Sequence, residues 1–114
     1  ANDKRLSKAS RQVIERAGTE IFFSAASAWE IAVKCKLGKL ELPTSPETFV
    51  SSQLAKNNFS SLPITISHAL RVYTLEGSHR DPFDLMLIAQ SAVERMPIIT
   101  ADPQFEQFAI EIIW

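Results

Sequence analysis

Short apolar runs that alternate with helical stretches most constrain how this sequence can fold. Glu20–Ser24 (EIFFS), Pro97–Thr100 (PIIT) and Ile110–Trp114 lack the alternating polar positions of a half-exposed strand. A further extended segment is expected over residues 59–65. Strands that are apolar on both sides are typical of parallel sheets covered by helices. The pattern therefore predicts an α/β fold with a mostly parallel sheet flanked by helices.

The expected helices precede or lie between these strands, and several have recognisable start signals. Ser45, Asp81 and Asp102 each precede a proline, and a capping side chain followed by proline is a frequent helix start. Glycines at positions 18 and 38 mark expected helix ends. The predicted helices cover residues 6–14, 25–37, 46–57, 67–76 and 82–95, with a brief one over 103–108.

Length and composition set the class of protein. The 114 residues, 46% of them hydrophobic, are enough for one domain with its own core, so we expect a single domain over residues 1–114. One cysteine, Cys35, cannot form an internal disulfide, which favours the reducing cytoplasm. The chain has neither an apolar run of the roughly 20 residues that a membrane span needs nor a signal-peptide pattern. A net charge of -1 does not by itself indicate nucleic-acid binding.

Three acids on separate expected elements form a candidate metal site. Glu30 lies in the helix after EIFFS, Asp84 in the first turn of the helix over 82–95, and Asp102 directly after PIIT. Ligands of open parallel sheets bind beyond the carboxyl ends of the strands. Carboxylates from separate elements suit Mg²⁺ or Mn²⁺ and metal-assisted phosphodiester hydrolysis.

Each of these acids also has a plain structural interpretation. Glu30 and Lys34 have the i,i+4 spacing of a helical ion pair. Asp81 and Asp102 each precede a proline, as N-cap residues often do. Asp84 lies in the first turn of its expected helix, where the positive end of the helix dipole stabilises a carboxylate. Residue type and spacing leave both interpretations open.

Other chemistries have less support. His68 and His79 are not spaced as a helical metal pair, and no glycine-rich phosphate loop occurs. Cys35 lies on an apolar helix that we expect to be largely buried, which favours a core residue over a nucleophile. His79 and Arg80 are either phosphate contacts or ordinary surface residues.

Four segments together resemble a known family. Residues 24–34 (SAASAWEIAVK), 37–43 (LGKLELP), 79–90 (HRDPFDLMLIAQ) and 99–103 (ITADP) closely resemble the PIN-domain toxins of the VapC type. The motifs occur in the family's order across nearly the whole chain, and residues 110–114 match its short final strand.

The resemblance implies a PIN-like fold and a metal-dependent endoribonuclease. Such proteins are toxins of bacterial or archaeal toxin-antitoxin pairs, normally homodimeric and held inactive by a cognate antitoxin. On this resemblance Glu30, Asp84 and Asp102 match the acidic site for Mg²⁺ or Mn²⁺ that cleaves RNA. The remaining matches are the supporting residues Asp81 and Thr100 and the phosphate contacts Lys34 and Arg80.

The family pattern also begins with an apolar strand that ends in an aspartate. No such segment precedes Ala1, so the first central strand and first acid are expected to be missing from this segment. An alternative function is a catalytically incompetent PIN-like module that only binds an antitoxin or partner subunit. A further alternative is a metal phosphoesterase acting on DNA or small molecules.

Overall fold

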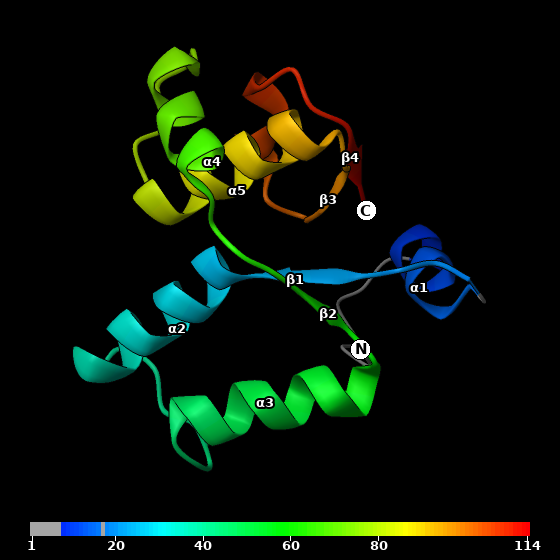
Figure 1. The fold of residues 1–114 in the computed structure, drawn as a ribbon, viewed down its shortest axis with the longest axis vertical. Coiled ribbons are helices and arrows are strands. Elements are labelled where there is room, and N and C mark those ends of the chain that lie inside the picture. Colours follow the sequence, from blue (N-terminus) through cyan, green and yellow to red (C-terminus); the bar gives the residue numbers. More distant parts are fainter. Residues whose placement is uncertain (1–7, 17) are drawn as a thin grey trace. The chain divides into compact units, whose positions relative to one another are not determined.

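The computed structural model describes residues 8–16 and 18–114 and contains two compact units. Unit 1 comprises the described part of residues 1–19 together with Ile64–Trp114, and unit 2 is Glu20–Pro63. Both units combine helices with a pair of parallel strands (Figure 1). This confirms the α/β class and the parallel pairing. The single domain over residues 1–114 and the missing first strand stay predictions.

Unit 2 is a strand, two helices and a second strand. β1 (Phe22–Ser24) leads directly into α2 (Ala25–Lys36), and α3 (Pro46–Asn57) leads into β2 (Ser60–Leu62). The strands pair in parallel, with Phe22 opposite Ser60. Parallel neighbours need a long crossover connection, which the two helices provide (Figure 1).

Capping side chains set the starts of both helices in unit 2. Ser24 Oγ accepts a hydrogen bond from the Ala26 amide at 2.9 Å, so the last residue of β1 also caps α2. Ser45 Oγ accepts from the Thr48 amide at 3.2 Å, with Pro46 in the first turn of α3. These bonds satisfy amides that have no partner within the helix. The predicted start of α3 at Ser45–Pro46 is confirmed.

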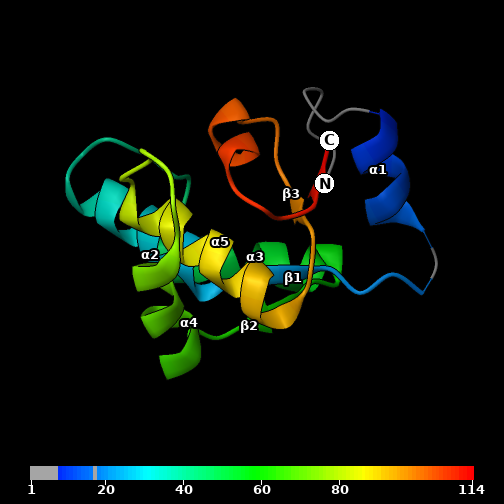
Figure 2. The ribbon, with the colours of Figure 1, turned by 90° about the horizontal axis from the view of Figure 1, so that it is seen from above.

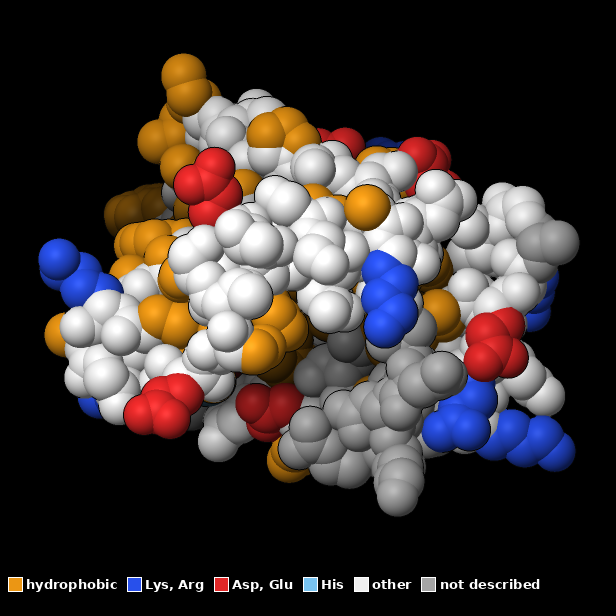
Figure 3. Space-filling model, turned by 90° about the horizontal axis from the view of Figure 1, so that it is seen from below, with side chains coloured by type: hydrophobic (Ala, Val, Ile, Leu, Met, Phe, Trp, Pro, Cys, Tyr) orange, Lys and Arg blue, Asp and Glu red, His pale blue; other side chains and the backbone are white. Residues whose placement is uncertain are grey.

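The expectation that α2 is largely buried is wrong. Only Ala26 of this helix is buried, whereas Trp29 is 47% exposed and the C-cap residue Leu37 is 60% exposed. Within unit 2 the main contacts of α2 are with α3 and β1. These neighbours cover only part of the surface of α2, although the helix has apolar residues on nearly every side. Hydrophobic side chains are visible at the surface on the face drawn in Figure 3. Cys35 is accordingly only partly buried.

Unit 1 contains the remaining elements. In chain order they are α1 (Lys8–Glu15), α4 (Ile66–Arg71), the 3-10 helix η1 (Val72–Thr74), α5 (Pro82–Glu94), β3 (Ile98–Ile99), the 3-10 helix η2 (Pro103–Gln107) and β4 (Ile112–Ile113). β3 and β4 pair in parallel, with Ile98 opposite Ile112. The four strands of the described chain thus form two short sheets of two strands each. Leu6, the predicted start of the first helix, lies outside the described residues.

The core of unit 1 forms around α5. Ile88 is fully buried and clusters with Phe105 of η2 and with Phe108. Figure 2 shows α5 leading into β3, with the orange η2 turn following. The buried residues of α5 are Ile88, Ala89, Gln90 and Ser91, which makes it the core helix of unit 1. Helices in the described part of the chain lack the combination of length and apolar character that a membrane span requires.

His68 joins α4 to α5. Its Nδ1 accepts a hydrogen bond from the Thr65 amide at 3.0 Å, and its own amide donates to Thr65 Oγ1 at 3.2 Å, forming a capping box. Its Nε2 lies 2.8 Å from Glu94 Oε2. Because Nδ1 accepts, the ring proton is assigned to Nε2, which donates to Glu94. The neutral ring therefore satisfies both of its nitrogens in a fully buried position.

Replacing His68 by leucine should lower the free energy of unfolding by about 1–3 kcal/mol, because the cap and the Glu94 partner are lost together. Urea denaturation of the full-length protein that contains these residues measures this. Tyr73→Ala is the control, since Tyr73 is 94% exposed and an exposed substitution changes stability by only about 0.5 kcal/mol. Equal denaturation midpoints for His68→Leu and the unmodified protein would contradict the proposed link.

Candidate active site

Asp81 caps the helix that carries Asp84. Asp81 Oδ1 accepts hydrogen bonds from the amides of Phe83 at 2.9 Å and Asp84 at 3.0 Å, and Pro82 follows the cap. The proline has no amide proton to satisfy and its backbone angle suits a helix start. The predicted N-cap role of Asp81 is confirmed. Its bonds also hold the backbone of Asp84 in the first turn of α5.

Asp84 is paired with His79. His79 Nε2 lies 2.7 Å from Asp84 Oδ2, and the two side chains are only 14% and 19% exposed. The imidazole also lies beside Phe105, with ring centroids 6.4 Å apart and planes inclined by 50°. The alternative of His79 as an ordinary surface residue is therefore wrong. Sequence analysis missed this pair, and the only available signal was the position of His79 in the loop before the Asp81 cap.

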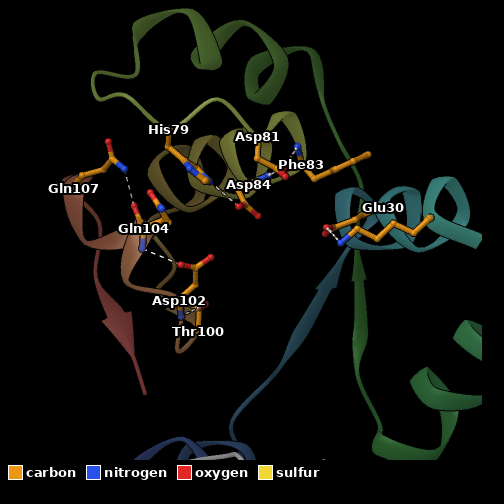
Figure 4. A network of polar contacts seen from close by, with 10 residues as sticks. Glu30, His79, Asp81, Phe83, Asp84, Thr100, Asp102, Gln104 and Gln107 are labelled. Atoms are coloured by element: carbon orange, nitrogen blue, oxygen red, sulfur yellow. Dashed lines mark hydrogen bonds and ion pairs between the residues drawn. The ribbon is translucent and has the colours of Figure 1, made fainter. Parts of the chain in front are cut away.

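Asp102 organises the turn after β3. Its Oδ1 accepts from the Gln104 amide at 2.9 Å and caps η2, as predicted from the following Pro103. The Asp102 amide donates to Thr100 Oγ1 at 3.1 Å. Thr100 and Asp102 are therefore held in one hydrogen-bonded turn (Figure 4). Asp102 itself is exposed.

The connection from α5 to β3 brings Asp102 back toward the start of α5. The helix contacts β3, and the chain reverses at Arg95, which has a left-handed backbone with φ of 56°. From Asp84 to the helix end the rise is roughly 15 Å at about 1.5 Å per residue. The extended return from Pro97 to Asp102 covers roughly 16 Å at about 3.3 Å per residue. Both acids are therefore expected at the same end of α5.

Hydrogen bonds of Gln107 join the loop before α5 to the η2 turn. Gln107 Oε1 accepts from the Ser78 amide at 2.9 Å, and Gln107 Nε2 donates to the Gln104 carbonyl at 3.0 Å. The loop that leads to His79 and the turn that follows Asp102 are thus connected within unit 1. Figure 4 shows the bond between Gln107 and Gln104.

Glu30 lies in unit 2 and forms the predicted helical ion pair. Lys34 Nζ lies 2.7 Å from Glu30 Oε2, and the two side chains are 47% and 25% exposed. Such a pair contributes only about 0.2–0.5 kcal/mol to a helix. Arg80, the other predicted phosphate contact, is exposed in unit 1. The roles of Glu30, Lys34 and Arg80 at a site stay predictions.

Comparison with known proteins identifies the family. The family model described as PIN domain matches residues 1–111. The chain belongs to the PIN-domain family. A segment of 59 residues is 36% identical to Ribonuclease VapC16 of Mycobacterium tuberculosis (strain ATCC 25618 / H37Rv), covering 52% of this chain and 40% of that protein. The chain thus aligns with less than half of the length of this relative. No solved structure matches the chain.

This family membership confirms the resemblance to VapC-type PIN domains. In the part of this PIN-domain chain that the structure describes, no three His, Cys, Asp or Glu side chains gather closely enough to hold a metal ion. The donor chemistry nevertheless fits, because Glu30, Asp84 and Asp102 offer the carboxylate oxygens that Mg²⁺ and Mn²⁺ prefer. The assignment of these acids as metal ligands remains a prediction.

The two hydrogen bonds to Asp81 generate a prediction about stability. Asp81→Ala should lower the free energy of unfolding of the full-length PIN-domain protein by about 1 kcal/mol, because both amides lose their acceptor. Asp81→Asn should retain most of the stability, since asparagine is an equally good N-cap. Denaturation curves of the two variants, compared with the unmodified protein, test this. Equal losses for alanine and asparagine would show that charge, rather than capping, is what Asp81 supplies.

Proposed function

We propose that this PIN-domain chain acts, within its full-length protein, as a divalent-metal-dependent endoribonuclease toxin. The observation that carries the proposal is the PIN-domain match over residues 1–111. The similarity to a protein named Ribonuclease VapC16 supports RNA as the substrate. The predicted acids and their surrounding motifs lie within the matched range.

In this proposal Glu30, Asp84 and Asp102 hold Mg²⁺ or Mn²⁺. When bound, the cation would supply positive charge that activates water and stabilises the negative charge on the phosphate during cleavage. The protein's own contribution is placement of the carboxylates. Asp81 secures the backbone of Asp84 through the cap of α5, and Thr100 accepts the hydrogen bond of the Asp102 amide. Both act as supporting residues that limit the movement of a ligand.

Two cations of the chain are proposed phosphate contacts. The Lys34 side chain is 47% exposed beside Glu30, and Arg80 is exposed next to His79. An exposed cation near the acids would attract the phosphate backbone, which a net charge of -1 does not do globally. Arg80 can also donate two parallel hydrogen bonds to one phosphate.

The proposal includes a cognate antitoxin that inhibits the nuclease, a homodimer and a cytoplasmic location. The similarity to VapC-type PIN domains supports this part of the proposal. The half-buried free thiol of Cys35 is compatible with a reducing compartment.

A second candidate is a PIN-like module that binds an antitoxin or partner subunit without cleaving RNA. One observation favours it, because three of the acids have structural partners of their own. Asp81 and Asp102 cap helices, and Glu30 is paired with Lys34. Cleavage by the full-length protein distinguishes the two candidates.

RNA cleavage by the full-length protein should require Mg²⁺ or Mn²⁺ and stop in EDTA. Asp84→Asn should lower the cleavage rate by about 100-fold or more, because loss of a direct ligand should exceed the 10–100-fold effect typical of an outer partner. The rate is measured on a pool of structured RNAs by gel electrophoresis, with DNA of matched sequence as the second substrate.

Glu106→Gln is the control, because Glu106 is an exposed acid in the same turn as Asp102 but outside the proposed ligand set. It should leave the rate unchanged. Cleavage that survives both EDTA and Asp84→Asn would overturn the metal mechanism. Antitoxin binding with no cleavage of any RNA would establish the noncatalytic module, and cleavage of DNA alone would establish a different phosphoesterase.

A further inference from the structure

The loop before α5 is held against the η2 turn by one glutamine side chain. Gln107 Oε1 accepts from the Ser78 amide at 2.9 Å, while its Nε2 donates to the Gln104 carbonyl at 3.0 Å. The backbone amide of Gln104 in turn donates to Asp102 Oδ1 at 2.9 Å. Hydrogen bonds therefore link Ser78 to Asp102 by way of Gln107 and Gln104, and Figure 4 shows the part from Gln107 to Asp102.

Gly77 allows the loop to approach Gln107 this closely. A Cβ at position 77 would lie 2.4 Å from Gln107 Oε1 and 3.4 Å from Phe108. Gly77 also has a backbone φ of +126°, which residues other than glycine rarely adopt. The direction in which the chain leaves position 77 toward His79 is thus set by close packing as well as by hydrogen bonds.

His79 is the next side chain that this loop positions. Its Nε2 lies 2.7 Å from Asp84 Oδ2, and its ring lies beside Phe105 of the same η2 turn. The side chain is only 14% exposed. The imidazole therefore lies between the core turn and the carboxylate, where its movement is restricted on both sides.

We propose that His79 is a positioning residue that orients the Asp84 carboxylate for a divalent cation, and that Gln107 positions His79 by holding its loop. The part concerning the cation rests on the function proposed above. Asp81 holds the backbone of Asp84, and the contact with His79 constrains the rotation of its side chain. Hydrogen-bonded outer partners of this kind orient metal-binding carboxylates.

The chain contains a matched pair that separates positioning from simple stabilisation. His68 Nε2 lies 2.8 Å from Glu94 Oε2, at the other end of α5. This is again an imidazole Nε2 against a carboxylate oxygen, at nearly the same distance as between His79 and Asp84. Glu94 is outside the proposed ligand set. Breaking the His68 pair should therefore affect stability alone, whereas breaking the His79 pair should also affect cation binding.

The first experiment measures Mn²⁺ affinity of the metal-depleted full-length protein by electron paramagnetic resonance of free Mn²⁺. His79→Leu should weaken binding by about 10-fold, the lower end of the effect of losing an outer partner. His79→Gln should restore most of the affinity, because its amide can donate from a position close to Nε2. His68→Leu, which breaks the pair with Glu94, should reduce stability in urea and leave Mn²⁺ affinity unchanged.

Gln107→Leu is an independent variant in case His79→Leu fails to fold. Gln107 is exposed, so its replacement leaves the core around Ile88 in place. It should weaken Mn²⁺ binding in the same direction as His79→Leu. Unchanged affinity in both variants, alongside weaker binding in Asp84→Asn, would overturn this inference and leave the proposed function standing. No Mn²⁺ binding by the unmodified protein would overturn both.

The second experiment needs no metal. Nitrogen-15 spectra of the imidazole rings should show that Asp84→Asn shifts the Nε2 signal of His79 but not that of His68. Gln107→Leu should shift or broaden the same His79 signal, because the loop loses its anchor. A His79 signal that responds to neither substitution would overturn the positioning role independently of any result on RNA cleavage.

Discussion

The packing of Ile88 against Phe105 and Phe108 is the interaction on which unit 1 depends. Burial of a large apolar side chain contributes about 1.5–3 kcal/mol to folding stability, and this cluster contains three such buried side chains. Phe105 lies within η2 and Phe108 directly after it. The same contact therefore joins α5, which carries Asp84, to the turn that Asp102 caps, so this core and these two acids are not independent features.

A carboxylate that caps a helix retains acceptor positions for a second partner. Asp102 caps η2 through Oδ1, and Asp81 caps α5 through Oδ1. An ionised carboxylate has two oxygens with about four acceptor positions, so a cap bond does not exclude a second partner. The structural and the functional interpretation of Asp102 are therefore compatible. The cap also fixes the backbone of Asp102, whose carboxylate would need precise placement to bind a cation.

Much of the local structure could be predicted from residues that act on their immediate neighbours. The starts of α3, α5 and η2 follow from Ser45, Asp81 and Asp102, each next to a proline. The Glu30–Lys34 pair follows from helical spacing. The burial of α2 could not be predicted in this way, because an apolar helix is buried only as far as its neighbours cover it. Trp29 is half exposed for this reason.

The pairing of His79 with Asp84 marks the limit of what the sequence determines. The sequence alone indicated the α/β class, the parallel strands, the starts of α3, α5 and η2 and, through its motifs, the PIN-domain family, because these depend on local periodicity, on capping and on residue identity. Only the tertiary structure decided that the loop after Gly77 rests on Gln107 and directs His79 to Asp84. Ser78 and Gln107 are 29 residues apart in the chain, and only packing around the α5 core brings them together.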